Sequence, residues 1–370
     1  MAPGNEGETF AGRVWLGDDG RVAAVTRAGD PAPSGFGTAR VVEAGEAFVY
    51  PGLIDLHSHL AYNSLPLWVD PLQATPYLHR DIWPGEKSYG PEISWTAWTL
   101  LTRAPETLLA YAQVRALAGG TTAIQGWPAL SRNPANKLVR SVDNDAVGPL
   151  TDPVLVSTLT LKAADLARRA AQLRDGRILV YHCAEGQPGT RVARDFDDLA
   201  TAGCLQPGLV AIHCTALDRS HFDRWRAAAG HTPGGAVVWS PLSNLWLYGV
   251  TSDVPGALGA GLAVTLGSDW GPSGTRNLLG ELKVARLWSE RSGWGLTALD
   301  LARMVTAAPG DVLARAWQAP AGRLVAGGLG DLAVLRRRHA DPWESLVISR
   351  EADVELVVVG GRARYGTRAA

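Results

Sequence analysis

The sequence has few cysteines and no long uninterrupted hydrophobic run. Its 370 residues include three cysteines, Cys183, Cys204 and Cys214, and so low and odd a count argues against a disulfide framework. No apolar segment approaches the roughly 20 residues of a transmembrane helix. The first residues lack the basic start and apolar core of a signal peptide, so we expect a cytoplasmic protein without a membrane partner.

An excess of charge of one sign is also absent. The formal net charge is −1 at pH 7, which gives no electrostatic signature of nucleic-acid or membrane binding. Because 46% of the residues are hydrophobic, the chain can build one large barrel and a small accessory unit. We expect a small-molecule or short-peptide substrate as the partner. The sequence does not decide between a monomer and a homo-oligomer.

A short apolar run, 49–56, ends in the pair His57 and His59. Side chains alternate faces along a strand, so both imidazoles point to the same side. Two such imidazoles on a rigid strand provide half of a metal site, although two half-exposed histidines at a strand edge would give the same pattern.

Three later strand-like runs also end in a residue that can bind metal. The run 177–182 ends in His182, 209–213 in His213, and 263–269 in Asp269. Active sites of (β/α)8 barrels lie at the C-terminal ends of the strands. The pattern therefore predicts a parallel barrel that brings these four strand ends together.

These motifs resemble those of the amidohydrolase superfamily, in the branch that contains cytosine deaminase and the triazine and adenosine-analogue hydrolases. They occur in family order and span most of the chain. The segments that carry the resemblance are 51–59 (PGLIDLHSH), 119–122 (GGTT), 182–185 (HCAE), 211–214 (AIHC), 240–244 (SPLSN) and 266–269 (LGSD).

The resemblance implies an α/β fold with a (β/α)8 TIM barrel formed by residues 50–321. It also implies a small β-sandwich accessory domain formed by residues 1–49 and 322–370. One divalent metal ion is expected at the barrel mouth, zinc ahead of manganese, iron or cobalt, with a position left open for water. The metal ligands that the resemblance implies are His57, His59, His182 and Asp269, and Asp269 is also expected to take a proton from the water.

Two further residues have catalytic roles in this resemblance. Glu185 lies just past the end of its strand, and in the family this glutamate carries a proton to the leaving nitrogen; the alternative is a solvated loop glutamate. His213 either polarises the substrate or binds a second metal. Two-metal relatives need a bridging carboxylated lysine, and Lys162 is the only lysine near the fourth strand, already in a predicted helical turn. We therefore favour one metal and a catalytic His213.

The segment 61–104 lacks a clear pattern of secondary structure. Structureless segments longer than about 15 residues are uncommon and often functional, so we expect it to cover the barrel mouth. Tryptophan is frequent here and at the strand ends, and it supplies large, rigid apolar contact area. We therefore expect a bulky apolar or aromatic substrate. The predicted substrate-binding residues are Trp68, Trp83, Trp95, Trp246, Trp270 and His79.

The other barrel strands are predicted at 121–127, 137–142, 154–160 and 236–240, and helices at 106–118, 161–173 and 297–317. The connection between the third and fourth strands is too short for a full helix, which predicts an irregular barrel there. A hairpin is predicted over 13–25. Asn244 is interpreted as a structural residue of its loop, and Cys183 and Cys214 as core residues that point away from the barrel interior.

Trp270 departs from the family pattern, which has a small residue after the aspartate of the eighth strand. Here the chain is similar to bacterial amidohydrolases encoded with peptide natural products, such as that of the bottromycin pathway, which removes a follower peptide. We therefore predict hydrolysis of an amide or cyclic-amide C–N bond in a bulky, peptide-derived substrate. One alternative is deamination of a purine, pyrimidine or related heterocycle. Another is a non-catalytic binding protein on a decayed barrel, against which the intact residue set argues.

Overall fold

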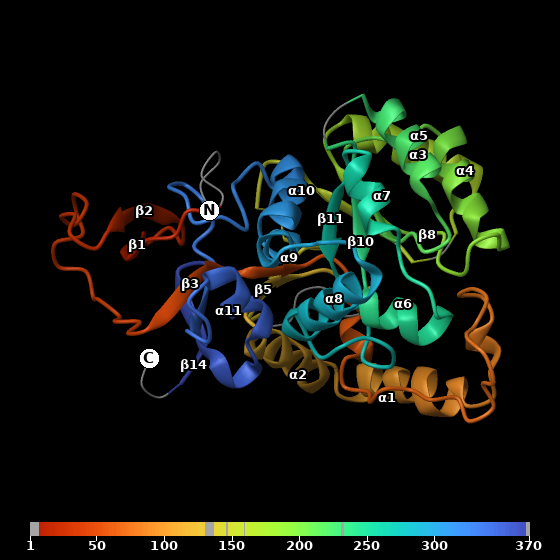
Figure 1. Cartoon of the computed structure of the whole chain (residues 1–370), viewed down its shortest axis with the longest axis horizontal. Coiled ribbons are helices and arrows are strands. Elements are labelled where there is room, and N and C mark those ends of the chain that lie inside the picture. The colour runs from red at the N-terminus through yellow and green to blue at the C-terminus, as the bar shows by residue number, and fades with distance from the viewer. Residues whose placement is uncertain (1–6, 130–136, 146, 159, 231–232, 368–370) are drawn as a thin grey trace.

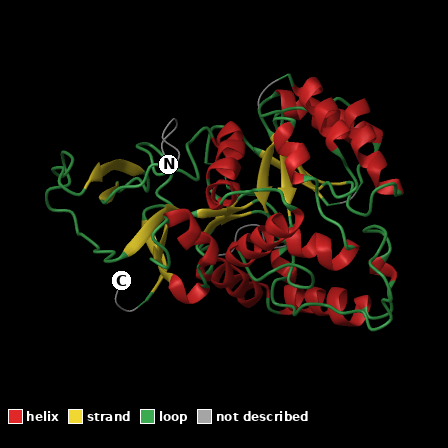
Figure 2. Ribbon diagram, in the orientation of Figure 1, coloured by secondary structure: helices red, strands yellow, loops and turns green. Residues whose placement is uncertain are grey.

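The computed structural model describes residues 7–129, 137–145, 147–158, 160–230 and 233–367. Within these residues, eight parallel strands form the centre of the molecule, and helices surround them (Figure 1, Figure 2). The strands are β4 (Leu53–Asp55), β5 (Thr121–Ile124), β6 (Arg140–Ser141), β7 (Val154–Ser157), β8 (Ile178–Cys183), β9 (Leu209–His213), β10 (Ala236–Trp239) and β11 (Ala263–Leu266). The expected parallel-barrel architecture is confirmed, although the predicted fourth strand included residue 159, which lies outside the described residues.

The eight strands pair as two sheets, in the orders β4-β5-β6 and β11-β10-β9-β8-β7. A parallel bridge between Ser58 and Asp269 joins them where β4 meets β11. At the opposite edge, no ladder joins β6 to β7 in the described part of the chain. The expected irregularity is therefore present. The connection contains Gly148, Pro149 and Pro153, which disfavour a regular helix.

Strands β8 and β9 are buried along their whole length, as expected for parallel strands covered on both faces. Val180, Val210 and Val238 pack in one cluster inside the barrel. Leu179 and Leu209 belong to a second cluster beneath the outer helices. Because side chains alternate along β8, His182 shares the inner face with Val180. Cys183 and Cys214 belong to the outer cluster, which confirms their prediction as core residues.

The outer helices follow the strands in sequence. They are α2 (Pro105–Ala118), α3 (Ala163–Arg174), α4 (Arg194–Thr201), α5 (Arg219–Ala229), α7 (Val254–Gly259), α8 (Leu278–Ser292), α9 (Ala298–Val305) and α10 (Ala307–Trp317). The prediction of a single helix over 297–317 is wrong, because the helix is interrupted at Thr306 (φ −130°, ψ −88°). Pro309 has no backbone N–H, so a continuous helix would leave the carbonyl of Val305 unpaired. No helix among the described residues is long and apolar enough to cross a membrane.

The segment after His59 is more regular than expected. Helix α1 (Trp95–Arg103) follows a π-helical turn (Gly90–Ser94), and short 3-10 turns span Leu60–Tyr62 and Trp83–Gly85. The sequence contains no glycine or proline between 92 and 104, which permits this helix. The segment packs beside α6 (Pro241–Tyr248), as Figure 1 shows for α1 and α6. Their shared core comprises Leu65, Trp68, Tyr77, Ile93, Ala97, Leu247, Tyr248 and Trp270.

The two ends of the chain form two sheets that pack on a shared core, in agreement with the expected small β-sandwich: Val14 and Leu16 pack against Leu332, Val334 and Val358. Strands β1 (Gly12–Leu16) and β2 (Val22–Arg27) make the predicted hairpin, which lies apart from the strands of the barrel in Figure 1. Strand β3 (Ala47–Pro51) pairs with β12 (Leu332–Arg336) in the order β14-β13-β12-β3, with β13 (Val354–Val359) and β14 (Arg362–Gly366). Helix α11 (Pro342–Ile348) lies between β12 and β13 in the chain. The division into domains at residues 49 and 322 stays a prediction, and its termini, 1–6 and 368–370, lie outside the described residues.

Glu281 of α8 joins two loops that border the barrel mouth. Its carboxyl group accepts the backbone N–H of Leu242, at the start of α6, and of Thr275, in the loop after β11, at 3.2 and 2.9 Å. The side chain is fully buried. Burial raises the pKa of Glu281 to about 8, against an ordinary value of 4.5, although the two hydrogen bonds act in the opposite direction.

This raised pKa predicts a stability that depends on pH. Between about pH 4.5 and 8 the unfolded chain loses the proton of Glu281 while the folded chain keeps it, so the free energy of unfolding should fall as pH rises through this window. Denaturant unfolding of wild type and Glu281→Gln from pH 5 to 9 measures the effect. The difference between the two proteins should change with pH, whereas exposed Glu106→Gln should follow the wild type throughout. Parallel curves for wild type and Glu281→Gln would contradict the account.

Candidate active site and metal centre

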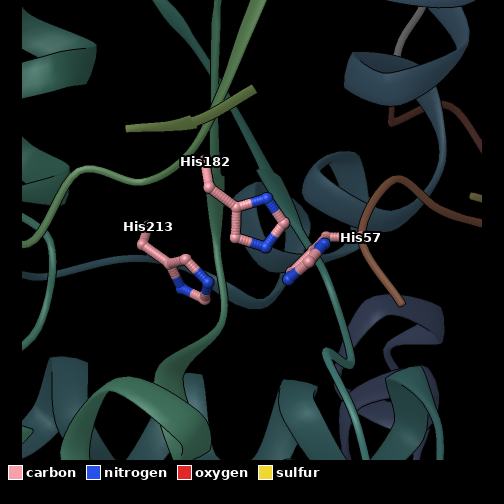
Figure 3. A group of neighbouring side chains, drawn as sticks. All are labelled: His57, His182 and His213. Carbon is pink, nitrogen blue, oxygen red and sulfur yellow. The ribbon is translucent and has the colours of Figure 1, made fainter. Parts of the chain in front are cut away.

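The structure brings all the predicted metal ligands to one end of the barrel. His57 and His59 follow β4, His182 lies in β8, His213 ends β9, and Asp269 follows β11. The ring centroid of His57 lies 4.9 Å from that of His59, 4.7 Å from that of His182 and 5.1 Å from that of His213. Figure 3 shows three of these imidazoles facing a common space.

The donor atoms form two overlapping groups that share His57. One contains His57, His182 and His213, and the other contains His57, His59 and Asp269; in each group the donor atoms lie within 4.8 Å of one another. The Oδ1 atom of Asp269 lies 3.0 Å from His57 Nε2 and 3.6 Å from His59 Nε2. Imidazole nitrogen and carboxylate oxygen together are a donor set typical of catalytic zinc.

The protonation states of His59, His182 and Asp269 also fit a divalent cation, whereas the pKa of His57 is raised because Asp269 outweighs the effect of burial. Burial lowers the pKa of His182 well below its ordinary value and that of His59 to about 3, so both imidazoles are neutral. Burial raises the pKa of Asp269, but the neighbouring histidines outweigh it and hold this pKa well below its usual range. Among the described residues, Nδ1 of His57 and Nδ1 of His182 are buried without a hydrogen-bond partner. Deprotonated ligands with unused donor nitrogens are what metal binding requires.

The ends of β4 and β11 are tied together around His57. Asp269 N donates to His57 O at 2.9 Å, and His59 N donates to Asp269 O at 3.0 Å. Beneath them, Asp55 accepts the hydroxyl of Ser268 at 2.5 Å. Gly267 is needed for this approach, because a Cβ there would lie 2.6 Å from Cβ of His57. Burial raises the pKa of Asp55 to about 6, which Ser268 partly opposes.

His213 reaches the site through an unusual backbone conformation. Ile212 packs inside the barrel, so simple alternation would turn His213 outward, but its φ of +67° breaks the alternation. Its Nδ1 lies 2.9 Å from Asn244 Oδ1. The amide nitrogen of Asn244 donates to Ser252 Oγ at 3.3 Å, which leaves its oxygen to accept from His213.

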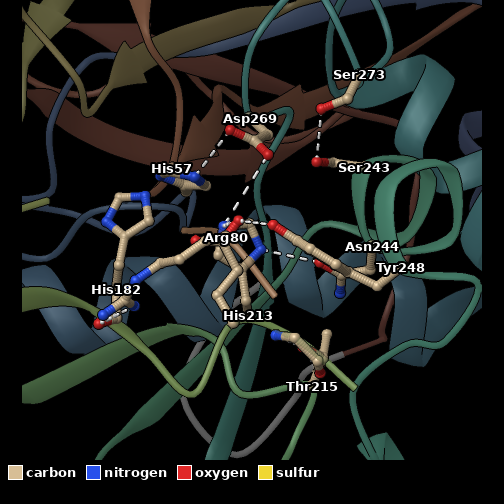
Figure 4. A network of polar contacts seen from close by, with 12 residues as sticks. His57, Arg80, His182, His213, Thr215, Ser243, Asn244, Tyr248, Asp269 and Ser273 are labelled. Atoms are coloured by element: carbon tan, nitrogen blue, oxygen red, sulfur yellow. Dashed lines mark hydrogen bonds and ion pairs between the residues drawn. The ribbon is translucent and has the colours of Figure 1, made fainter. Parts of the chain in front are cut away.

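The tautomer of His213 follows from that bond. Since Nδ1 carries the proton, Nε2 of the neutral ring presents a lone pair to the site, 3.7 Å from Glu185 Oε1 and 4.0 Å from Asp269 Oδ2 (Figure 4). From the sequence, we predict only a structural role for Asn244 within its own loop. Its second role depends on a contact with a residue 31 positions away, and no local pattern signals it.

Glu185 is buried, with 4% of its surface exposed, so the alternative of a solvated loop glutamate is wrong. Its Oε1 accepts the hydroxyl of Tyr248 at 2.5 Å. The hydroxyl oxygen of Tyr248 in turn accepts Nε1–H of Trp83 at 3.0 Å. Tyr248 did not emerge from the sequence, because it lies in a short apolar helix where an aromatic residue indicates ordinary core packing.

Arg80 is a second residue that the sequence did not reveal. Its guanidinium donates to the carbonyl of His182 at 3.1 Å and pairs with Asp195 at 3.0 Å. Its backbone N–H donates to the carbonyl of Glu185 at 3.1 Å. This arginine therefore connects the mouth segment, residues 61–104, to the loop that contains Glu185, the predicted proton carrier.

Two of the predicted substrate-binding residues, Trp83 and Trp270, lie near the metal ligands. The rings of Trp83 and Trp270 lie 5.1 Å apart, and Tyr62 lies 5.4 Å from Trp270 and 6.2 Å from His59. These rings form an aromatic wall beside His59, whose side chain is 26% exposed. Substrate contact by Trp83 and Trp270 is compatible with this wall and stays a prediction.

The other predicted substrate-binding residues support the mouth segment itself. Trp68 is buried and stacks on Tyr77, and Trp246 donates its indole N–H to the carbonyl of Trp68. Trp95 is 65% exposed on α1, and the backbone of His79 bridges that of Gly186. Contact between these four residues, Trp68, Trp95, Trp246 and His79, and a substrate stays a prediction.

Lys162 precedes α3 at the protein surface. It borders a shallow cavity of about 480 Å³, together with Thr160 and Asp165. Neither donor group found among the described residues includes it. This position gives no support to a bridging lysine and a second metal.

No family model matches the chain. It is 26% identical to the 5-methylthioadenosine/S-adenosylhomocysteine deaminase of Syntrophobacter fumaroxidans, over 93% of this chain and 86% of the relative. It is 24% identical to the 5'-deoxyadenosine deaminase of Methanothermobacter thermautotrophicus, over 93% and 87%.

Solved structures show the same fold. An adenosine deaminase from Xanthomonas campestris with bound zinc has a TM-score of 0.68 and 17% identity, over 97% of this chain and 89% of that one. A mutant atrazine chlorohydrolase from Arthrobacter aurescens, complexed with zinc and atraton, has a TM-score of 0.69 and 18% identity, over 94% and 89%.

The fold and the converged donor set define a metal-dependent hydrolase of the parallel-barrel class. Together with the deaminase relatives, they indicate an enzyme that hydrolyses C–N bonds, and the chain is similar in sequence to deaminases and in fold to a triazine hydrolase. Zinc is the metal of its structural neighbours. The assignment of His57, His59, His182 and Asp269 as the residues that would hold it here stays a prediction.

Removal of one ligand tests this metal site. His57 is common to both donor groups, so His57→Ala should lower zinc from about one equivalent per chain to below roughly a tenth. Elemental analysis of protein purified without chelator measures it. His339→Ala, at an exposed histidine after β12, is the control and should keep its zinc. Equal zinc in both variants would exclude the proposed ligand set.

Proposed function

We propose that the chain is a zinc-dependent aminohydrolase that deaminates the purine ring of an adenosine-type nucleoside with an apolar 5' group. The observation that carries the proposal is the convergence of Glu185, His213 and Asp269 on one donor set in a chain whose relatives are named as deaminases of such compounds. The relatives favour this alternative over removal of a follower peptide. The abundance of tryptophan also loses force as an argument for a peptide, because Trp68 packs within the protein and the indole N–H of Trp246 bonds to the carbonyl of Trp68.

The aromatic wall suits a flat, aminated ring. Tyr62 and Trp83 are half-buried, contact the buried Trp270, and present apolar surface beside His59, the most open of the four predicted ligands. A purine stacked against such a wall loses water from the face that contacts the rings, which favours a planar heterocycle over a saturated chain. In our proposal, the edge of the purine that carries the amino group points toward His59 and the buried carboxylates.

The chemistry divides among the residues of the site. A divalent metal held by the four ligands would activate a water molecule near neutral pH. Asp269, held ionised, accepts one proton of the attacking water, and the lone pair of His213 Nε2 accepts a hydrogen bond from that water. As the water oxygen bonds to the ring carbon, Glu185 accepts the other water proton and delivers it to the ring nitrogen. When the C–N bond breaks, Asp269 passes its proton to the amino group, which leaves as ammonia, and the ring carbonyl forms.

Ammonia release tests this function directly. Wild-type protein loaded with one equivalent of zinc should release ammonia from 5'-methylthioadenosine or 5'-deoxyadenosine faster than from guanine or cytosine. Glu185→Gln should keep its zinc and lose turnover by at least about 100-fold, because it can no longer carry the proton. A dipeptide and a cyclic amide serve as substrates for the competing hypothesis. Hydrolysis of these, without ammonia from any nucleoside or base, would overturn the proposal.

A further inference from the structure

The hydroxyl of Tyr248 has a direction that its two partners fix. Trp83 Nε1 lies 3.0 Å from the oxygen, and an indole nitrogen can only donate. The oxygen must therefore accept from Trp83, and the single hydroxyl proton points at Glu185 Oε1, 2.5 Å away. Burial and the charge of Glu185 raise the pKa of Tyr248 well above its ordinary value, so this proton stays in place.

That direction distinguishes the two oxygens of Glu185. Oε1 accepts the Tyr248 hydroxyl, and a proton placed on it would have to compete with this short, charge-assisted bond. Oε2 is left to receive and release a proton. We propose that Tyr248 is a positioning residue that places the transferable proton of Glu185 on Oε2, and that Trp83 orients Tyr248 for this role. The inference rests on the proposed function, because it assigns a role within the same proton transfer.

A single stretch of the mouth segment controls both parts of Glu185. Arg80 N donates to the carbonyl of Glu185 at 3.1 Å, and Trp83, three residues later, acts on its carboxylate through Tyr248. Trp83 also packs 5.1 Å from Trp270, which follows Asp269 directly. Trp83 thus orients the hydroxyl that bonds to the carboxylate, and Arg80 fixes the backbone of the same residue. Tyr248 therefore differs from an ordinary buried tyrosine, because its hydroxyl links Trp83 to the carboxyl group of Glu185.

Tyr77 is a matched control for the loss of a buried tyrosine hydroxyl. It packs in the same cluster as Tyr248, and its hydroxyl donates to Asp70 at 3.1 Å within the mouth segment. A purely structural role for Tyr248 predicts similar behaviour of the two Phe variants. A positioning role predicts that only Tyr248→Phe slows turnover.

The kinetic test uses the full-length zinc-loaded enzyme and 5'-methylthioadenosine. Tyr248→Phe should lower kcat by about 10–100-fold with KM changed less than about threefold and zinc content unchanged, and Trp83→Phe should have a smaller effect in the same direction. Tyr77→Phe should keep the wild-type kcat. In a Glu185→Gln background, Tyr248→Phe should cause no further loss, since Tyr248 acts through Glu185. An unchanged kcat in Tyr248→Phe, or an equal loss in both backgrounds, would overturn the inference.

A second measurement does not depend on the substrate. The infrared difference between wild type and Glu185→Gln isolates the carboxylate band of Glu185 in the resting enzyme. Tyr248→Phe should shift this band, because it removes a short hydrogen bond to Oε1, and Tyr77→Phe should not. A shift without ammonia release from any nucleoside would remove the proposed function but keep the bond. An unshifted band in Tyr248→Phe would refute the positioning role whatever the substrate.

Discussion

The site depends on the close approach of β4 and β11 around the buried His57. Reciprocal backbone hydrogen bonds join His57 and His59 to Asp269, and Asp55 holds Ser268 beneath them. A side chain larger than hydrogen at Gly267 would push these strand ends apart. No ladder joins β6 to β7 among the described residues, so the two sheets meet there only at this seam, through the bridge between Ser58 and Asp269. Three of the four predicted ligands lie at this seam, so the same backbone contacts that close the barrel also fix the positions of these ligands.

The mouth segment completes the site from outside the barrel. Arg80 bonds to the backbone of Glu185, and Trp83 acts on its side chain through Tyr248. Asn244 fixes the tautomer of His213. Buried polar groups are costly unless they are hydrogen-bonded, and here each bond also orients a reactive atom. The left-handed backbone at His213 and Asp269 shows that the same contacts maintain local strain at the strand ends.

The convergence of the predicted metal ligands could be inferred from the sequence because each one lies at or just after the end of a buried strand, and parallel strands end at one face of a barrel. The order of strands and most outer helices followed from the same patterns. Local patterns failed where a distant contact decides: Tyr248, Arg80 and the second role of Asn244 depend on partners 63, 102 and 31 residues away. Helix α1 was missed because the aromatic and proline-rich sequence before it obscured its periodicity. Tryptophan content alone does not distinguish substrate contact from packing, since Trp68 and Trp270 lie in the core of the mouth segment.

The central claim is that one metal and one set of side chains deaminate a purine nucleoside. Titration of metal-free protein with zinc, with ammonia release from 5'-methylthioadenosine measured at each step, tests it in one experiment. The account predicts that activity rises linearly and stops rising at about one zinc per chain. A break at two equivalents would contradict the single-metal site and make His213 a ligand. No ammonia at any zinc level would contradict the proposed deaminase activity for this substrate.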